Sequence, residues 1–239
     1  MAHPSRWSES GDPGIFPTMH HGIEAQGFVV IPQVLGSDER AKWITRLGPV
    51  AGAGRRGLLS EPDVATLARS KQLLDLIRPH LLSEPVPVRA IYFDKSPDAN
   101  WLVPWHQDLT LAVHARIEVP GFGPWRMKDR VPHVQPPVKL LEQMITVRLH
   151  FDDTDESNGA LRVLPGSHRK GRLSATDIQE LRCQQTEVLC AAPAGDALLM
   201  RPLLLHASGR STVTRHRRVL HLEYAAFDLP SPLQWHERS

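Results

Sequence analysis

The sequence predicts a mainly β fold with flanking helices, built as a double-sheet barrel around an internal pocket. Two strand-like stretches, residues 143–151 and 217–225, each alternate between an apolar face and a more polar one. The apolar faces suit packing against helices and the polar faces suit the lining of a pocket, as in a double-sheet barrel. The 21 prolines in 239 residues favour frequent turns over long helices.

The length fits one domain, and the composition excludes several classes of partner. Residues 1–22 are polar and rich in proline and glycine, so we expect a flexible N-terminal arm, followed by a single domain over residues 23–239. A formal charge of +2 with scattered basic residues argues against nucleic acid. No apolar stretch approaches the roughly 18 residues of a membrane span, and the first residues carry no signal-peptide core. We therefore expect a cytoplasmic monomer or dimer whose partner is a small molecule.

The N-terminal half predicts one short strand and three helices that cover a sheet. The strand runs over residues 27–32 and ends at a proline. A capped helix follows at about residues 39–47, a second begins at Pro62, and a third covers residues 71–82 with apolar side chains at helical spacing. From residue 88 the pattern changes to strands, the first over residues 88–94.

Candidate metal ligands follow that strand. His106 and Asp108 are two residues apart, so on an extended backbone both side chains leave the same face. With one further histidine they would make the facial triad that suits non-haem Fe(II). A His-x-Asp pair arises about once by chance in such a composition, and a rival pair occurs at His150 and Asp152.

Residues 115–138 read as a long loop. They follow a possible strand at residues 109–114 and hold five prolines and two glycines without periodicity. A loop this long in a compact domain is usually a lid, a binding loop or disordered. Because it follows the candidate ligands closely, we expect a lid over the substrate.

The stretch 143–151 is the clearest strand. Its apolar face should pack on the helices and carries Ile145, Val147, Leu149 and Phe151. Its other face would line the pocket and carries Met144, Thr146, Arg148 and His150. Asp152 lies at the strand end in an acidic turn, so we rank the second His-x-Asp pair below the first.

The last third alternates short strands and turns. Asn158-Gly159 predicts a hairpin with residues 160–164 as the returning strand. A short helix at residues 174–181 precedes strands at 186–191, 197–200 and 203–205. On the final strand the pocket side carries Arg217, Val219 and His221. We expect His114, His133 and His221 to be structural and not metal ligands, and His168 to be structural or at the surface.

Three stretches together carry a family resemblance: WHQD at residues 105–108, NGALRVLPGSH at residues 158–168, and His206-x-Ser208 followed by Arg217. With them the chain resembles the phytanoyl-CoA dioxygenase family of Fe(II)- and 2-oxoglutarate-dependent oxygenases over about residues 27–224. The resemblance implies a double-stranded β-helix core of jelly-roll, cupin-like type. It also implies Fe(II) as cofactor, 2-oxoglutarate and O2 as cosubstrates, and succinate and CO2 as products of the oxidation of a small molecule.

Residue roles carried over from the family are also implied by the resemblance. His106, Asp108 and His206 would bind the iron, and Arg217 would pair with the distal carboxylate of 2-oxoglutarate. The planar fork of arginine suits a carboxylate, and strand parity favours Arg217 over the neighbouring arginines. Further candidate contacts of 2-oxoglutarate are Ser208, Thr146 and Lys95.

The reaction type and the substrate are less constrained. Related halogenases replace the carboxylate ligand with a small residue, so Asp108 favours hydroxylation or another oxidation. Candidate substrate-pocket residues are Trp101, Trp105, Met144, Arg148 and Trp125, and we expect no catalytic residue beyond the metal centre. Two alternatives remain open: a non-catalytic metal-binding protein of this fold, and a cupin-like metalloenzyme without 2-oxoglutarate in which Arg217 is structural.

Overall fold

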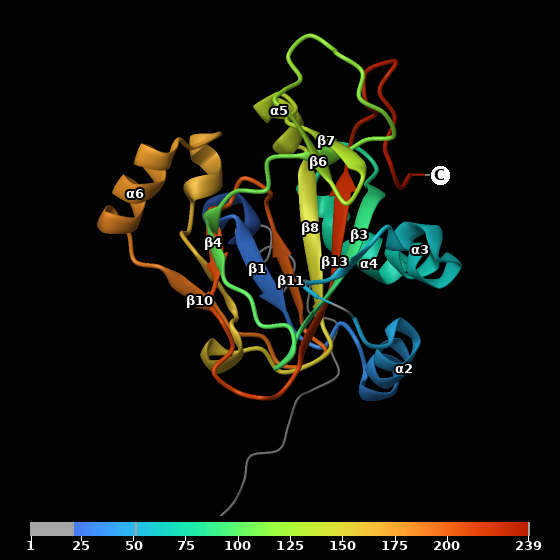
Figure 1. Ribbon diagram of the computed structural model, residues 1–239, viewed down its shortest axis with the longest axis vertical. Helices are drawn as coiled ribbons and strands as arrows, with labels where there is room; N and C mark the ends of the chain where they lie inside the picture. Colours follow the sequence, from blue (N-terminus) through green and yellow to red (C-terminus); the bar gives the residue numbers. More distant parts are fainter. Residues whose placement is uncertain (1–21, 51, 239) are drawn as a thin grey trace, which may run out of the picture.

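Two facing antiparallel sheets organise the protein (Figure 1). The computed structural model describes residues 22–50 and 52–238. The six-stranded sheet has the order β1 (Phe28–Ile31), β11 (Ala197–Met200), β8 (Met144–His150), β13 (Arg217–Ala225), β3 (Val86–Lys95) and β2 (Arg55–Arg56). The four-stranded sheet has the order β10 (Val188–Cys190), β9 (Leu161–Val163), β12 (His206–Ser208) and β4 (Val103–His106). The predicted mainly β, jelly-roll class is therefore confirmed.

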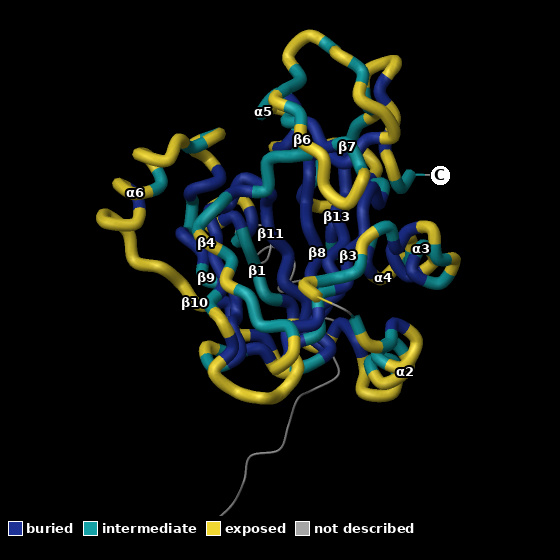
Figure 2. The backbone as a smooth tube through the Cα atoms, in the orientation of Figure 1, coloured by how far each residue is buried: buried dark blue, intermediate teal, exposed yellow. Residues whose placement is uncertain are grey.

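Three helices cover the outer face of the six-stranded sheet, on the right in Figure 1. They are α2 (Ser37–Leu47), α3 (Pro62–Ala68) and α4 (Lys71–Ile77). Their apolar side chains form one core with the outward faces of β8 and β13, where Leu220, Leu222 and Tyr224 are fully buried. Each such side chain contributes about 1.5–3 kcal/mol by leaving water. Figure 2 shows the resulting dark band of buried strands between exposed connections.

The third predicted helix is shorter than expected. Helix α4 ends at Ile77 and passes into a 3-10 turn, η2 (Arg78–His80), instead of reaching Leu82. Pro79 has no amide hydrogen to continue the helical ladder, which explains the early end. The short helix η1 (Leu58–Ser60) precedes α3, and α5 (Val138–Leu141) precedes β8.

The hairpin predicted at Asn158-Gly159 is wrong. Strands β8 and β9 belong to different sheets, and β9 pairs with β10 and β12. The side chain of Asn158 instead closes a 3-10 turn, η3 (Glu156–Asn158): its Oδ1 accepts from the Asp155 amide at 2.8 Å and its Nδ2 donates to the Asp153 carbonyl at 2.7 Å. The dipeptide therefore turns the chain from one sheet to the other.

The segment 115–138 contains regular structure, contrary to the prediction of an irregular loop. It folds into a hairpin of β6 (Trp125–Lys128) and β7 (Val131–Val134), to which β5 (Leu111–Ala112) adds a third strand. Asp129 and Arg130 form the turn with φ of 49° and 65°, as a tight hairpin requires. This small sheet lies at the top of Figure 1. Whether it acts as a lid stays a prediction.

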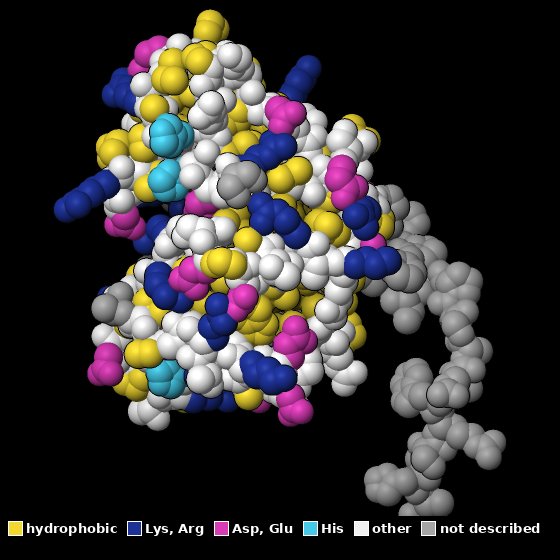
Figure 3. Space-filling model, turned by 90° about the vertical axis from the view of Figure 1, so that its right-hand side faces the viewer, with side chains coloured by type: hydrophobic (Ala, Val, Ile, Leu, Met, Phe, Trp, Pro, Cys, Tyr) yellow, Lys and Arg dark blue, Asp and Glu magenta, His cyan; other side chains and the backbone are white. Residues whose placement is uncertain are grey.

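The remaining elements lie at the periphery. The 3-10 turn η4 (Ser167–Lys170) and helix α6 (Ala175–Gln184) follow β9, beside the four-stranded sheet. No helix in the described part of the chain is long and apolar enough to cross a bilayer. On the face shown in Figure 3, Lys and Arg side chains mix with Asp and Glu, so no single-sign patch covers it. The predicted arm lies outside the described residues except for Gly22, which is helical.

Candidate metal centre

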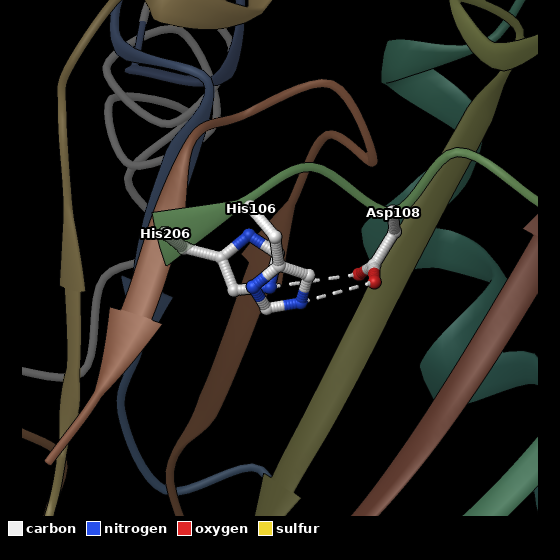
Figure 4. A group of neighbouring side chains, drawn as sticks. All are labelled: His106, Asp108 and His206. Atoms are coloured by element: carbon white, nitrogen blue, oxygen red, sulfur yellow. Dashed lines mark ion pairs between the residues drawn. The ribbon is translucent and has the colours of Figure 1, made fainter. Parts of the chain in front are cut away.

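Three predicted ligands converge between the two sheets (Figure 4). The Nε2 of His106 lies 3.6 Å from Asp108 Oδ1, and the Nε2 of His206 lies 3.7 Å from Asp108 Oδ2. One ligand atom from each residue falls within 4.8 Å of the others. These separations exceed hydrogen-bond lengths, so the three groups surround a space that a cation can share. In the described chain this is the one group of three such ligands.

Strand pairing brings the two histidines together. His206 begins β12 and is the Cα partner of His106 at the end of β4, and their ring centroids are 4.2 Å apart. Each Nδ1 faces a carbonyl two residues earlier, Pro104 at 2.9 Å and Leu204 at 2.8 Å. A carbonyl can only accept, so Nδ1 carries the proton in each neutral imidazole, and Nε2 is then the lone pair directed at Asp108.

Gln107 fixes the loop that carries Asp108, although the sequence did not single it out. Its side chain points away from the metal site, donates to the carbonyls of Gly171 at 2.8 Å and Leu203 at 2.7 Å, and accepts from the Leu173 amide at 2.9 Å. The Asp108 amide in turn donates to the Pro202 carbonyl at 2.9 Å. These bonds hold His106 and Asp108 on the same side of the chain.

The electrostatics of Asp108 and His206 favour a carboxylate and a neutral imidazole. Burial alone would raise the pKa of Asp108, but His206 and His106 outweigh it and hold that pKa well below its ordinary value. Burial lowers the pKa of His206 to about 4, against the opposing charge of Asp108. Burial lowers the pKa of His106, but the hydrogen bond and charge of Asp108 outweigh it and raise that pKa above its ordinary value. A charged carboxylate and a neutral imidazole are the protonation states that bind a metal.

The rival pair at His150 and Asp152 does not form a site. His150 is buried on the inner face with its Nδ1 2.9 Å from Thr154 Oγ1. Asp152 faces the opposite direction and pairs with Arg218 through its Nε at 2.8 Å and Nη2 at 2.6 Å. The two side chains therefore cannot bind one metal ion. This agrees with the prediction that ranked His150 and Asp152 below His106 and Asp108.

A cavity of about 180 Å³ adjoins the triad, and its inner wall is basic. Arg217 and Arg148 both line it, and both are almost fully buried. The Nε of each guanidinium is buried without a hydrogen-bond partner within the described chain. Burial lowers the pKa of Arg217 to about 9 and that of Arg148 to about 10. Buried cations with unused donors fit an anionic ligand with several oxygens.

Lys95 and Ser208 border the same basic region. The Lys95 ammonium is fully buried and donates to Ser208 Oγ at 3.0 Å and to the Gly209 carbonyl at 2.6 Å. Burial, followed by repulsion from Arg217, lowers the pKa of Lys95 to about 7. Ser208 lines the cavity, and Lys95 lies directly behind it.

The predicted substrate-pocket residues separate into two groups. Trp101 and Arg148 line the cavity, with the Lys95 ammonium 5.1 Å from the Trp101 ring. Trp105 packs on the other side of the four-stranded sheet against Leu164, Leu181 and Leu205. Two more predicted substrate contacts lie outside the cavity: Met144 in a separate apolar cluster and Trp125 beside Glu118. Thr146, predicted as a contact of 2-oxoglutarate, also lies outside the cavity, buried within β8.

Several cavity residues were missed by the sequence analysis. His221, expected to be structural, accepts from Arg148 Nη1 at its Nδ1 (2.9 Å) and faces Glu223 with its Nε2 (3.3 Å). Glu223 in turn accepts from Arg89 at 3.1 Å. The alternation that assigns Arg217 and His221 to the pocket side assigns Glu223 to it as well, so this signal was present in the sequence.

The fold and the site agree with one protein family. A family model described as phytanoyl-CoA dioxygenase (PhyH) matches residues 23–219, most of the chain. The chain belongs to the PhyH family. That stretch includes His106, Asp108, His206 and Arg217.

Curated relatives of this PhyH member are named as dioxygenases. It is 28% identical over 180 residues to a probable alpha-ketoglutarate-dependent hypophosphite dioxygenase of Stutzerimonas stutzeri, covering 69% of this chain and 54% of that protein. It is 25% identical over 187 residues to an ectoine dioxygenase of Streptomyces avermitilis, covering 70% and 56%. The chain thus spans about half the length of the curated relatives it matches.

Solved structures share the fold of this PhyH chain. EctD from S. alaskensis with bound Fe superimposes with a TM-score of 0.72 at 18% identity, covering 98% of this chain and 86% of that one. The epimerase SnoN, in complex with Fe3+, alpha ketoglutarate and nogalamycin RO, gives 0.69 at 16% identity and covers 92% of both chains.

Proposed function

We propose that the protein is a non-haem Fe(II)- and 2-oxoglutarate-dependent dioxygenase. His106, Asp108 and His206 hold the iron, and Arg217 holds the distal carboxylate of 2-oxoglutarate. The reaction oxidises a small molecule, most simply by hydroxylation, and releases succinate and CO2. Membership of the PhyH family and the dioxygenase names of its relatives support this assignment.

One observation carries the proposal: a buried cationic wall with unused donors stands beside a two-histidine, one-carboxylate triad. Burying a charge without a counter-charge costs several kcal/mol. In a metal-binding protein without an anionic cosubstrate, nothing would offset this cost for the two buried guanidinium groups. A dicarboxylate bound there supplies the missing counter-charge. This favours the dioxygenase over the two alternatives raised by the sequence.

The residues have separate tasks in this reaction. Bound at the triad, Fe(II) supplies the chemistry of O2 activation that is coupled to the oxidation of 2-oxoglutarate. Arg217, with Arg148 and Ser208 nearby, orients the cosubstrate by charge-assisted hydrogen bonds. Lys95 adds positive potential from behind Ser208. Trp101 forms an apolar wall that limits access of water to the cavity.

The hairpin of β6 and β7 completes the proposal as a lid, since its Lys128 reaches the rim of the metal cavity. Binding of metal and 2-oxoglutarate should then slow amide hydrogen exchange in residues 125–134. Unchanged exchange there on full occupancy would argue against a lid. A cytoplasmic location and a monomeric or dimeric state belong to the proposal, and fractionation and sedimentation test them.

Anaerobic calorimetry with Fe(II) and 2-oxoglutarate tests the central assignment. We expect 2-oxoglutarate to bind only after the metal, and O2 with a substrate to yield succinate in proportion to oxidised product. Binding of metal without binding of 2-oxoglutarate would instead support the cupin-like alternative. Binding of both without succinate for any candidate substrate would support a non-catalytic protein.

A further inference from the structure

A second cavity adjoins the metal cavity and is not explained by iron or 2-oxoglutarate. Its volume is about 250 Å³, and it lies between the β2–β3 edge, the β6–β7 hairpin and the C-terminal segment. The two cavities share three wall residues, Arg56, Arg89 and Lys128. A molecule that extends from the metal cavity past these three side chains therefore enters the second cavity.

The shared wall is positively charged. Arg89 pairs with Glu223 at 3.1 Å, and Arg56 pairs with Asp129 at 2.6 Å. Lys128 has no carboxylate within 4.0 Å in the described structure, and its ammonium donates only a long 3.3 Å bond to Thr110 Oγ1. Partial desolvation by the cavity walls and then the charge of Arg89 lower the pKa of Lys128, against the opposing charges of Asp108 and Glu223. Lys128 is exposed, so its ammonium is hydrated and free to contact an anionic ligand where the two cavities meet.

His133 offers an unused acceptor in the wall of the second cavity. It is 1% exposed, and its Nδ1 lies 3.0 Å from the Val131 carbonyl, so Nδ1 carries the proton. The Nε2 is then a lone pair, and it is buried with no hydrogen-bond partner in the described chain. Burial lowers the pKa of His133 to about 4, which keeps the ring neutral.

The other ionisable groups of the second cavity are His236, Asp129 and Glu237. The Glu237 carboxylate is already used, because it accepts from the amides of Leu59 at 3.3 Å and Ala90 at 3.1 Å. Asp129 is bound by Arg56. His236 is exposed. Within the described residues, the groups that face the cavity without a protein partner of opposite kind are thus the exposed Lys128 ammonium and the buried Nε2 of His133.

The size of the metal cavity also points to a second compartment. At about 180 Å³ it is smaller than the usual small-molecule pocket of about 300–1,000 Å³, and 2-oxoglutarate must share it with the substrate. The two cavities taken together fall within that range. A substrate whose reacting end lies at the metal would have its remote end beside Lys128.

We propose that the second cavity binds the remote end of the substrate, and that this end is an oxyanion with a neighbouring hydroxyl or amino group. Lys128, with Arg56 and Arg89, holds the anion, and His133 Nε2 accepts the hydrogen of the neighbouring group. The substrate is then a small hydroxylated or aminated organic anion. The inference rests on the proposed function, because that function sets the reacting end at the triad.

Glycerol 3-phosphate, an oxyanion with adjacent hydroxyls, serves as the probe, and glycerol is its neutral counterpart. Calorimetry on the full chain, anaerobic and saturated with Fe(II) and 2-oxoglutarate, should detect glycerol 3-phosphate and not glycerol at millimolar concentration. Lys128→Met should weaken the affinity about tenfold, as expected for one charge-assisted contact. His133→Phe should weaken it several-fold. Lys42→Met, an exposed lysine on α2, should leave the affinity unchanged.

Three results would overturn the inference: no binding of the probe, equal binding by the Lys128→Met and wild-type proteins, or displacement of 2-oxoglutarate by the probe. Displacement of 2-oxoglutarate would mean that the probe binds beside Arg217 in the metal cavity.

Failure of the proposed function gives a different result, since 2-oxoglutarate would then fail to bind the metal-loaded protein. Lys128-dependent binding of the probe in such a protein would retain the anion site and reject only the dioxygenase. His133 is buried, whereas Lys128 is exposed. If His133→Phe does not fold, Lys128→Met alone decides the test.

Discussion

The guanidinium of Arg217 donates a hydrogen bond from Nη1 to the carbonyl oxygen of Gly159, at 2.7 Å. The same carbonyl accepts from Ser208 Oγ at 2.7 Å, so one backbone oxygen positions two of the proposed contacts of 2-oxoglutarate. Gly159 adopts φ +80°, and a Cβ there would lie 2.5 Å from the Gly209 carbonyl oxygen and 3.0 Å from Lys95 Nζ. Only glycine therefore fits the turn that carries this oxygen.

Gly159→Ala should destabilise the protein and weaken 2-oxoglutarate binding. A left-handed backbone with a side chain costs about 1 kcal/mol or more, and the clash with the Gly209 carbonyl should raise the loss to about 3 kcal/mol. Urea unfolding measures this difference. Gly52→Ala is the matched control, because Gly52 has φ +76° with open space around it. Equal losses in the two variants would show that the clash is absent.

Removal of His106 should abolish metal binding, whereas removal of His150 should not. His106 supplies a bare Nε2 to the triad, and His150 lies on the inner sheet face without a carboxylate beside it. His106→Ala should lower the Fe(II) affinity by about 100-fold or more, since one of three protein ligands is lost. Anaerobic calorimetry with Fe(II) provides the affinities. A loss of metal with His150→Ala and retention with His106→Ala would reverse the choice between the two motifs.

Much of this arrangement follows from strand alternation, which a sequence displays directly. The period-two patterns of β8 and β13 correctly separated the helix-facing leucines from Arg148, Arg217 and His221. Alternation also explains one error: Trp105 precedes His106 on β4, so its side chain leaves the opposite face and packs beyond the sheet. The alternation of side chains along β4 was therefore enough to place Trp105 outside the pocket.

Other features depend on pairing and depth, which one sequence does not display. Thr146 has the parity of Arg148, but the cavity ends before it reaches that part of β8. Glu223 meets Arg89 only because β13 pairs with β3 in one register, across more than a hundred intervening residues. The second cavity needs the β6–β7 hairpin, whose two short strands were hidden by Pro132 and by the prolines and glycines that flank them in residues 115–138.

Arg217→Met should weaken 2-oxoglutarate binding by about 100-fold while leaving the metal affinity near that of wild type. The guanidinium lines the cavity and makes no ion pair within the described chain, so its main loss is the contact with the cosubstrate carboxylate. Calorimetry of the metal-loaded variant measures the affinity.

Arg218→Met is the matched control for Arg217→Met. Arg218 is the next residue on β13, but it points outward and pairs with Asp152. Its loss should cost about 1 kcal/mol of stability, as for a partly exposed ion pair, without a change in 2-oxoglutarate affinity. Comparable losses of 2-oxoglutarate affinity in both variants would contradict the parity on which the choice of Arg217 depends.

The buried Lys95 ammonium should make the stability of the metal-free protein depend on pH. Its pKa is about 7 in the folded chain and about 10.4 in an unfolded one, so the unfolded state binds the extra proton between these values. The cost of burying the charge is fully present below pH 7 and diminishes as the pH rises toward about 10.

Lys95→Met removes this contribution. The free energy of unfolding of wild type relative to Lys95→Met should therefore rise by about 2–3 kcal/mol between pH 7 and pH 9. Urea titrations of both proteins measure it, with Lys42→Met as an exposed control that should follow the wild-type curve. A constant difference between wild type and Lys95→Met across this range would mean that Lys95 stays protonated in the folded protein.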